Sequence, residues 1–229
     1  MIRKASFVLA VTVLAATVAT SGALTASAQS DSVPITKLDR QLARVDIGIS
    51  GAGEFNRTAT GTIIPAASPN AGQPVSDQVS NTLGALVSVR YIARPYVGLE
   101  FNYTYARYTE NFSYPPPAFG VQTQANEFTL GYVITPAHQL FGFQPFVSAG
   151  LGSMEFKPTP RGGEGLTRQA RAAYYYSAGL QQEYMSGHFG LRASFRQVIY
   201  LDPDFGQNYL TIKQHTITTE PTAGFYFRF

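Results

Sequence analysis

The stretch HTITTEPTAGFYFRF, from His215 to Phe229, carries the pattern that decides the fold. Its second half alternates strictly between two kinds of residue. The apolar positions are Ala223, Phe225, Phe227 and Phe229, and Gly224, Tyr226 and Arg228 fall between them. Successive side chains of a β-strand point to opposite faces, so this alternation predicts a strand with one aromatic face and one polar face.

Seven further stretches alternate in the same way, which makes eight predicted strands with the last one. They are Val45–Asn56, Ser80–Tyr91, Tyr96–Tyr108, Gln124–Thr135, Gln144–Phe156, Arg171–Met185 and His188–Tyr200. The connections after the second, fourth and sixth strands are short, and the others are long and rich in Pro, Gly, Asn and Asp. An even number of strands joined by short turns at one end and long loops at the other is typical of an outer-membrane barrel.

The beginning of the chain is different. A basic start at Arg3 and Lys4, an apolar run and the small residues Ala26-Ser27-Ala28 predict a secretory signal peptide over residues 1–28. We expect a periplasmic lead-in over 29–44 and a barrel over 45–229, with no further domain. Without the signal peptide, the 17 basic against 14 acidic residues become 15 against 14, so no partner nucleic acid is expected. The chain has no cysteine.

The volume and the charge of the side chains indicate which face of the strands points into the barrel. Most of the aromatic rings share the apolar face, and an eight-stranded lumen is barely wide enough for side chains to fill it. Arg90, Arg192, Arg196 and Arg228 all fall on the polar face, and an arginine facing lipid at the midplane would destabilise the barrel by about 2–4 kcal/mol. The sequence therefore predicts an all-β fold, an eight-stranded antiparallel up-and-down transmembrane β-barrel, with its polar face inward.

The inward charges fall into two layers, which predicts a lumen plugged by a network of ion pairs. The layer near the short turns holds Asp46, Glu100, Glu183, Arg90, Arg192 and Arg228. The layer near the long loops holds Glu54, Glu127, Glu220, Arg171 and Arg196, with Glu155 as a possible member. The first layer is balanced and the second has an excess of acid. A narrow porin or small-solute channel is the alternative function.

The whole predicted mature chain resembles the small outer-membrane barrels of the OmpA-like and OmpX-like type. The resemblance rests on the alternating strands, the loop lengths and the aromatic end of the chain, and it implies a bacterial outer-membrane location and a monomeric protein. It also implies that Phe225, Phe227 and Phe229 form a signal for the outer-membrane assembly machinery. The implied partners are the lipid bilayer and lipopolysaccharide, and no cofactor is implied.

Candidate chemistry outside the lumen is sparse. His215 resembles the histidine of outer-membrane lipid A deacylases, but the serine expected two positions on is Ile217, so we expect no enzyme and keep lipid A modification as a second alternative. Asp202 to Gly206 resembles a calcium loop only loosely and is read as a turn, and no metal site is expected. Contacts to lipopolysaccharide phosphates are expected from a basic group made of Lys157, Arg161, Arg168 and Arg171.

Two positions leave the register open. Pro221 lies inside the last strand, where its missing N–H favours a β-bulge. The register of the fifth strand after Gly152 has no clear preference, so the sequence does not assign Glu155 to either face.

Overall fold

In the computed structural model of this protein, residues 37–64, 70–94, 96–114, 117–184 and 188–229 are described. The expected signal peptide, 1–28, and the first part of the expected lead-in lie outside these residues. The described part of the lead-in contains one short helix, α1 (Lys37–Leu42). Among the helices in the described part of the chain, none is long and apolar enough to cross a membrane.

Ten strands form one sheet in the described residues. They are β1 (Val45–Asn56), β2 (Ala59–Thr62), β3 (Pro74–Val79), β4 (Thr82–Arg94), β5 (Val97–Phe112), β6 (Phe119–Ile134), β7 (Gln144–Pro158), β8 (Gln169–Tyr184), β9 (Phe189–Leu201) and β10 (His215–Arg228). A 3-10 helix, η2 (Asn208–Leu210), lies between β9 and β10.

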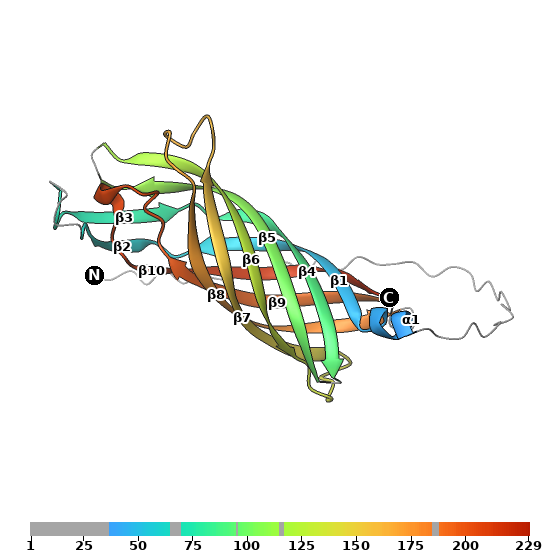
Figure 1. Cartoon of the computed structure of the whole chain (residues 1–229). Helices are drawn as coiled ribbons and strands as arrows, with labels where there is room; N and C mark the ends of the chain where they lie inside the picture. The colour runs from blue at the N-terminus through green and yellow to red at the C-terminus, as the bar shows by residue number, and fades with distance from the viewer. Residues whose placement is uncertain (1–36, 65–69, 95, 115–116, 185–187) are drawn as a thin grey trace, which may run out of the picture. The chain divides into compact units, whose positions relative to one another are not determined.

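Eight long strands close into a barrel, as predicted. β1 pairs with both β4 and β10, and the remaining strands follow in antiparallel order until β5 pairs with β6 and closes the ring. The closure joins the two ends of the barrel sequence, since Gly51 of β1 lies opposite Ala85 of β4 and Ala223 of β10. Closure satisfies the strand amides that would otherwise meet lipid. Figure 1 shows the strands wrapping around the barrel, with α1 at one end and the β2–β3 hairpin at the other.

The hairpin of β2 and β3 is an element that the sequence did not predict. It lies in the first long connection, and β3 continues the sheet by pairing with the end of β5, where Asp77 is opposite Phe112. β5 and β6 also run further than predicted and pair as far as Phe112 and Phe119. The alternation of inward and outward residues continues in this extension, since Glu110 and Phe112 have the inward parity of β5 and are fully buried. The second long connection is correspondingly shorter than expected.

The two faces of the barrel are oriented as predicted. Outward side chains stay accessible, such as Leu130 at 56% and Phe195 at 54%, whereas Asp46 and Glu127 on the inward face are each 1% exposed. A surface of this kind would be unfavourable in water but matches hydrocarbon. The arrangement therefore places apolar side chains toward lipid and charged side chains in the lumen.

Both open registers are settled. β10 contains no bulge, so that prediction was wrong: the register against β9 is continuous through Pro221, which lies opposite Phe195. On the β1 side the pairing stops after Thr222 and resumes in the same register at Thr219. The missing N–H therefore interrupts the ladder without adding a residue. β7 also keeps its register past Gly152, so Met154 and Phe156 face inward.

Candidate functional site

The barrel has two ends, which we call the short-turn end and the long-loop end. At the short-turn end, residues 135–143 connect β6 and β7; at the long-loop end lie the β2–β3 hairpin and residues 159–168 and 202–214. The lumen between them holds the predicted charged residues in two layers.

Four charged residues of the first layer form two ion pairs deep in the lumen. Arg90 of β4 pairs through Nε with Glu100 of β5, and Arg192 of β9 donates from Nη2 to Oδ1 of Asp46 at 3.1 Å. All four are at least nine-tenths buried. Opposite charges that share a dry interior compensate each other's lost hydration only when they are also hydrogen bonded. Gln181 adds such bonds, because its Oε1 accepts from both Arg90 and Arg192.

The remaining pair of this layer lies nearer to the short-turn end. Arg228 donates from Nη1 to Oε1 of Glu183 at 2.6 Å, and its Nη2 lies 3.8 Å from Oδ2 of Asp46. The side chains of Arg228 and Glu183 are 24% and 35% exposed. The structure thus brings all six residues of the balanced first layer into one connected set.

Aromatic rings separate the arginines of the first layer. The guanidinium carbon of Arg90 lies 4.1 Å from the ring centre of Phe146, and that of Arg192 lies 4.4 Å from the ring centre of Tyr226. Each is close enough for a cation–π interaction. Gly190 makes room for Tyr226, since a Cβ there would lie 2.4 Å from the ring. Phe146 was not predicted as a lumen residue, although it has the parity of Ser148 and Gly150.

The second layer is centred on Arg196 of β9. It pairs with Glu127 of β6 and Glu220 of β10, and its Nη2 donates to Oγ1 of Thr129 at 3.1 Å. Its guanidinium lies 4.7 Å from the ring centre of Tyr175. Arg196 therefore ties three strands together across the lumen.

This layer keeps its predicted excess of acid. Glu54 of β1 is 1% exposed, and neither of its carboxylate oxygens accepts a hydrogen bond from the described residues. Arg171, which was expected in this layer, and Glu155, whose face was left open, both lie elsewhere. Glu155 is on the outward face and pairs with Arg168, and Arg171 lies above the layer, where its Nη2 is 3.0 Å from Oδ1 of Asp204. Strand parity places Glu155 outward because the register of β7 does not change.

Above Arg196 the lumen is filled by apolar side chains, which the sequence analysis did not predict. The expectation of a polar filling was therefore wrong for this half. The buried cluster includes Tyr108, Phe112, Phe156, Tyr200, Phe205 and Leu210. The first four follow the inward parity of their strands, so their position was readable from the alternation. Phe205 and Leu210 come from the β9–β10 connection, which folds back into the mouth.

The long-loop end is closed by contacts between the first and last connections. Ile63, Val75 and Ile212 pack together in a second apolar cluster. The N–H of Ile64 donates to the carbonyl oxygen of Thr211 at 3.1 Å. We call this assembly of the β2–β3 hairpin and residues 202–214 the cap.

Asp204 organises the turn in the cap, in agreement with the prediction of turn chemistry. Its Oδ1 accepts from Gln169 at 2.6 Å and from the Gly206 N–H at 3.1 Å, and its Oδ2 accepts from Thr211 at 2.9 Å. Burial acts to raise the pKa of Asp204, but these hydrogen bonds, with the charge of Arg171, outweigh it and hold this pKa below its usual range.

Three other carboxylates are buried where the cap meets the end of β5. Asp77 of β3, Glu110 of β5 and Asp202 are all at least nine-tenths buried, and none of their oxygens accepts a hydrogen bond of ordinary geometry from the described residues. Burial, together with the charge of Asp202, raises the pKa of Asp77 well above its usual range. Burial also raises the pKa of Asp202 to about 7, against the pull of Arg171. Protonation of Asp202 therefore favours the closed cap.

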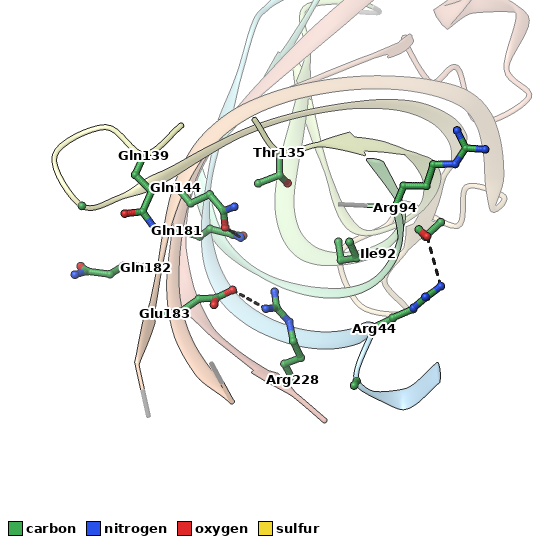
Figure 2. Close-up of a pocket in the computed structure, with 13 residues that line it drawn as sticks. Arg44, Ile92, Arg94, Thr135, Gln139, Gln144, Gln181, Gln182, Glu183 and Arg228 are labelled. Atoms are coloured by element: carbon green, nitrogen blue, oxygen red, sulfur yellow. Dashed lines mark hydrogen bonds and ion pairs between the residues drawn. The ribbon is translucent and has the colours of Figure 1, made fainter. Parts of the chain in front are cut away.

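A polar hollow opens at the short-turn end. Its volume is about 580 Å³. Figure 2 shows Gln139, Gln144, Gln181 and Gln182 on one side of it and Arg44 and Arg94 on the other. Its inner end is formed by Gln181, which donates to Gln144 at 3.0 Å and accepts from the arginines of the first layer. We call this hollow the vestibule. The vestibule was not predictable from the sequence, because its residues come from turns and strand ends that alternation does not bring together.

The predicted basic group near the long-loop end is only partly free. Lys157 and Arg161 are exposed, Arg168 is exposed but pairs with Glu155, and Arg171 is engaged with Asp204. His215 is exposed and Ile217 is two positions on, as in the sequence. In the described residues, no group of three or more His, Cys, Asp or Glu side chains has the geometry to hold a metal ion.

The predicted assembly residues all point outward. Phe225, Phe227 and Phe229 are 40–55% exposed, and the first two pack around Phe189 of β9, with ring centres 6.2 and 5.2 Å from its own. They form an aromatic patch at the short-turn end. Such rings are favoured where the hydrocarbon meets the headgroups.

Comparisons with known proteins agree with this geometry. The family model described as "Outer membrane protein beta-barrel domain" matches residues 12–225. The outer membrane protein OprG from Pseudomonas aeruginosa has a similar solved structure, with a TM-score of 0.56 and 12% identity over 81% of this chain and 95% of OprG. Neisserial surface protein A is similar as well, with a TM-score of 0.51 and 13% identity over 80% of this chain and 97% of that protein. No curated protein sequence matches this chain.

The two structural similarities establish the fold, and the family model covers nearly the whole sequence. The chain therefore belongs to the outer membrane protein beta-barrel domain family and lies in the bacterial outer membrane, in contact with the lipid bilayer.

Proposed function

We propose that this protein is a non-enzymatic and non-conducting barrel that acts through its external surface. The observation that carries the proposal is the filling of the lumen. The ion pairs of Arg192 and Arg196, the apolar cluster above them and the cap follow one another along the barrel. Short turns of such barrels face the periplasm and long loops face outside, so the cap lies on the outer face of the cell.

The ion pairs suit a structural role because they connect strands that are distant in the sequence. Arg192 of β9 reaches Asp46 of β1, and Arg196 of β9 reaches Glu127 of β6. When one partner of a buried, hydrogen-bonded ion pair is removed, the protein is strongly destabilised because the other charge is left uncompensated. The network therefore fixes the barrel in one arrangement and blocks the passage of water and ions.

The alternative function, a narrow porin, gains some support from the vestibule, which opens the lumen to the periplasmic side. A test is the flux of a small sugar into liposomes that contain the folded protein. We expect liposomes with the protein to swell in arabinose no faster than empty liposomes. Swelling that increases with the amount of protein would contradict the sealed lumen and favour the porin.

The external role rests on the basic residues of the long-loop end. We expect Lys157, Arg161 and Arg168 to contact lipopolysaccharide phosphates, since their side chains are accessible beside the bilayer. Replacing these three residues with glutamine should lower the amount of lipopolysaccharide that the purified barrel retains. Arg57 and Arg107, which are exposed arginines outside this group, give the control when replaced in the same way. Equal retention by the triple variant would remove this part of the proposal.

We also propose that Phe225, Phe227 and Phe229 are read by the assembly machinery, and that the protein performs no catalysis. His215 has no hydroxyl group two positions on. Thr216 and Thr218, the nearest hydroxyls in sequence, are buried and are engaged with the carbonyl oxygen of Arg57 and the side chain of Asn56. Replacing His215 with alanine should leave the lipid A composition of the cell unchanged.

A further inference from the structure

The connection between β6 and β7 contains a tight turn whose exposed side chains are apolar. Leu140 and Phe143 close a two-residue hairpin turn, because the N–H of each donates to the carbonyl oxygen of the other, at 2.8 and 2.9 Å. Both side chains are exposed, and Phe141 at the tip is 100% exposed. We call residues 140–143 the apolar turn. Large apolar side chains that share one exposed surface indicate a contact with a protein or a membrane.

The backbone of the apolar turn does not suit a bulky residue. Phe141 and Gly142 both have positive φ, at 52° and 82°, as a two-residue hairpin turn of this kind requires. Asn, Asp or Gly usually occupies the first of these positions, because a bulky side chain is strained at positive φ. Strain of this kind is found where a residue has a function. The phenylalanine does not favour the turn, so its side chain is better explained by a contact outside the chain.

The apolar turn lies on the lipid-facing side of the barrel wall. Phe143 lines an apolar hollow of about 530 Å³ in this wall, together with Leu180 of β8, Leu191 of β9 and Phe225 of β10. These three residues are exposed on the outward face of the barrel. Leu140 has the same orientation as Phe143, because directly paired residues of antiparallel strands point to the same side. The surface of the turn is therefore continuous with the surface that contacts the bilayer.

The sequence around the apolar turn favours lipid over a protein as its partner. Residues 131–146 contain no Lys, Arg, Asp or Glu, so insertion of the turn buries none of the charged groups that are costly in hydrocarbon. Gln139 and Gln144 flank the turn and can remain at the level of the headgroups. Figure 2 shows the connection that carries Gln139 on the same outer side of the barrel wall as the side chain of Gln182.

We propose that the apolar turn is a membrane anchor that inserts Phe141 into the periplasmic leaflet of the outer membrane. The short turns of such barrels face the periplasm, so the phospholipids of this leaflet are the lipids within reach. The ring of Phe141 lies among the acyl chains and fixes the depth of the barrel at its short-turn end. This role is independent of the sealed lumen and of the external surface, because the turn lies outside the lumen and at the opposite end from the cap.

The chain contains no tryptophan, so one introduced tryptophan reports only its own surroundings. The full chain with Phe141→Trp is folded in phosphatidylcholine vesicles, with or without bromine atoms near the headgroup end of the acyl chains, since bromine quenches tryptophan on contact. We expect brominated lipid to lower the emission at least twofold, as for Leu130→Trp on the lipid-facing wall. Ala71→Trp, in the exposed turn of the β2–β3 hairpin, is the matched control and should keep its emission. Unquenched emission from position 141, with quenching at position 130, would overturn the proposal.

A second pair of variants separates the role of Phe141 from the affinity of tryptophan itself for the membrane interface. Leu140→Trp is the reporter, alone and combined with Phe141→Asn. Asparagine is tolerated at positive φ, so the turn should be retained, and the mobility of unheated protein on a gel verifies the fold. We expect brominated lipid to quench the reporter at least twofold less in the combined variant. Equal quenching would show that Phe141 does not hold the turn in the leaflet and would refute the inference.

Discussion

Replacement of Arg196 by methionine is the perturbation for which the structure gives the clearest magnitude. The guanidinium is 2% exposed and pairs with Glu127 and Glu220. Methionine keeps much of the volume beside Tyr175 but leaves both carboxylates, and Glu54 beside them, without a cation in the same layer. Removing one partner of a buried ion pair destabilises a protein by about 3–5 kcal/mol. We expect a loss of that size in the free energy of unfolding.

The assay is unfolding by urea in lipid vesicles, followed by the mobility difference between folded and boiled protein on a gel. The matched control is Arg57→Met, because Arg57 is exposed, and a surface substitution changes stability by less than about 0.5 kcal/mol. The triple variant Arg196→Met/Glu127→Gln/Glu220→Gln should recover most of the loss, because no charge is left unpaired between these three. A loss below about 1 kcal/mol for Arg196→Met would refute the view that this layer holds the barrel together.

Three further predictions concern packing, pH and assembly. Gly190→Ala should destabilise the barrel by about 1–3 kcal/mol, measured by the same unfolding, because the new Cβ would meet the ring of Tyr226; a smaller residue at 226 should relieve the strain. Asp202 has a pKa of about 7 in the folded cap against about 4 in an unfolded chain, so its contribution to stability is fully present below pH 4 and is lost as pH rises through 7. The Ile64 amide should therefore be about tenfold better protected from hydrogen exchange at pH 5 than at pH 8, after correction for intrinsic rates, and equal protection would contradict the closed cap. Phe229→Ala should lower the folded fraction in cells without changing the stability of protein refolded in vesicles.

The barrel was predictable because alternation can be recognised within each strand separately, and it determines which side chains face the lumen of the whole barrel. In β1 and β10 the large apolar residues fall mainly on one face, and only one orientation of the two faces places Arg90, Arg192, Arg196 and Arg228 inside. The pairing of Asp46 with Arg192 follows from that closure and from depth in the barrel. The same reasoning predicts the position of Tyr108 and Tyr200, provided that the alternation is followed to the ends of the strands.

The cap and the vestibule were not predictable in this way. The β2–β3 hairpin is built from short segments, and its partners, the end of β5 and residues 202–214, are distant in the sequence. The vestibule gathers side chains from the residues after α1, from strand ends and from turns, whose directions depend on backbone geometry rather than on a repeating pattern. Pro221 shows a third limit of prediction from the sequence. Because proline has no backbone N–H, it indicates that the hydrogen bonds between two strands are interrupted. It does not indicate whether the interruption is a gap in the pairing or a β-bulge.

The most direct test of the central claim, a lumen sealed by Arg192 and Arg196 and by the apolar cluster above them, is the ionic conductance of the folded full chain in planar lipid bilayers. Insertion should be verified independently, by the gel mobility of protein recovered from the same vesicles. We predict a membrane current indistinguishable from that of the bare bilayer at moderate voltage. Steady single-channel steps that scale with salt concentration would contradict the sealed lumen.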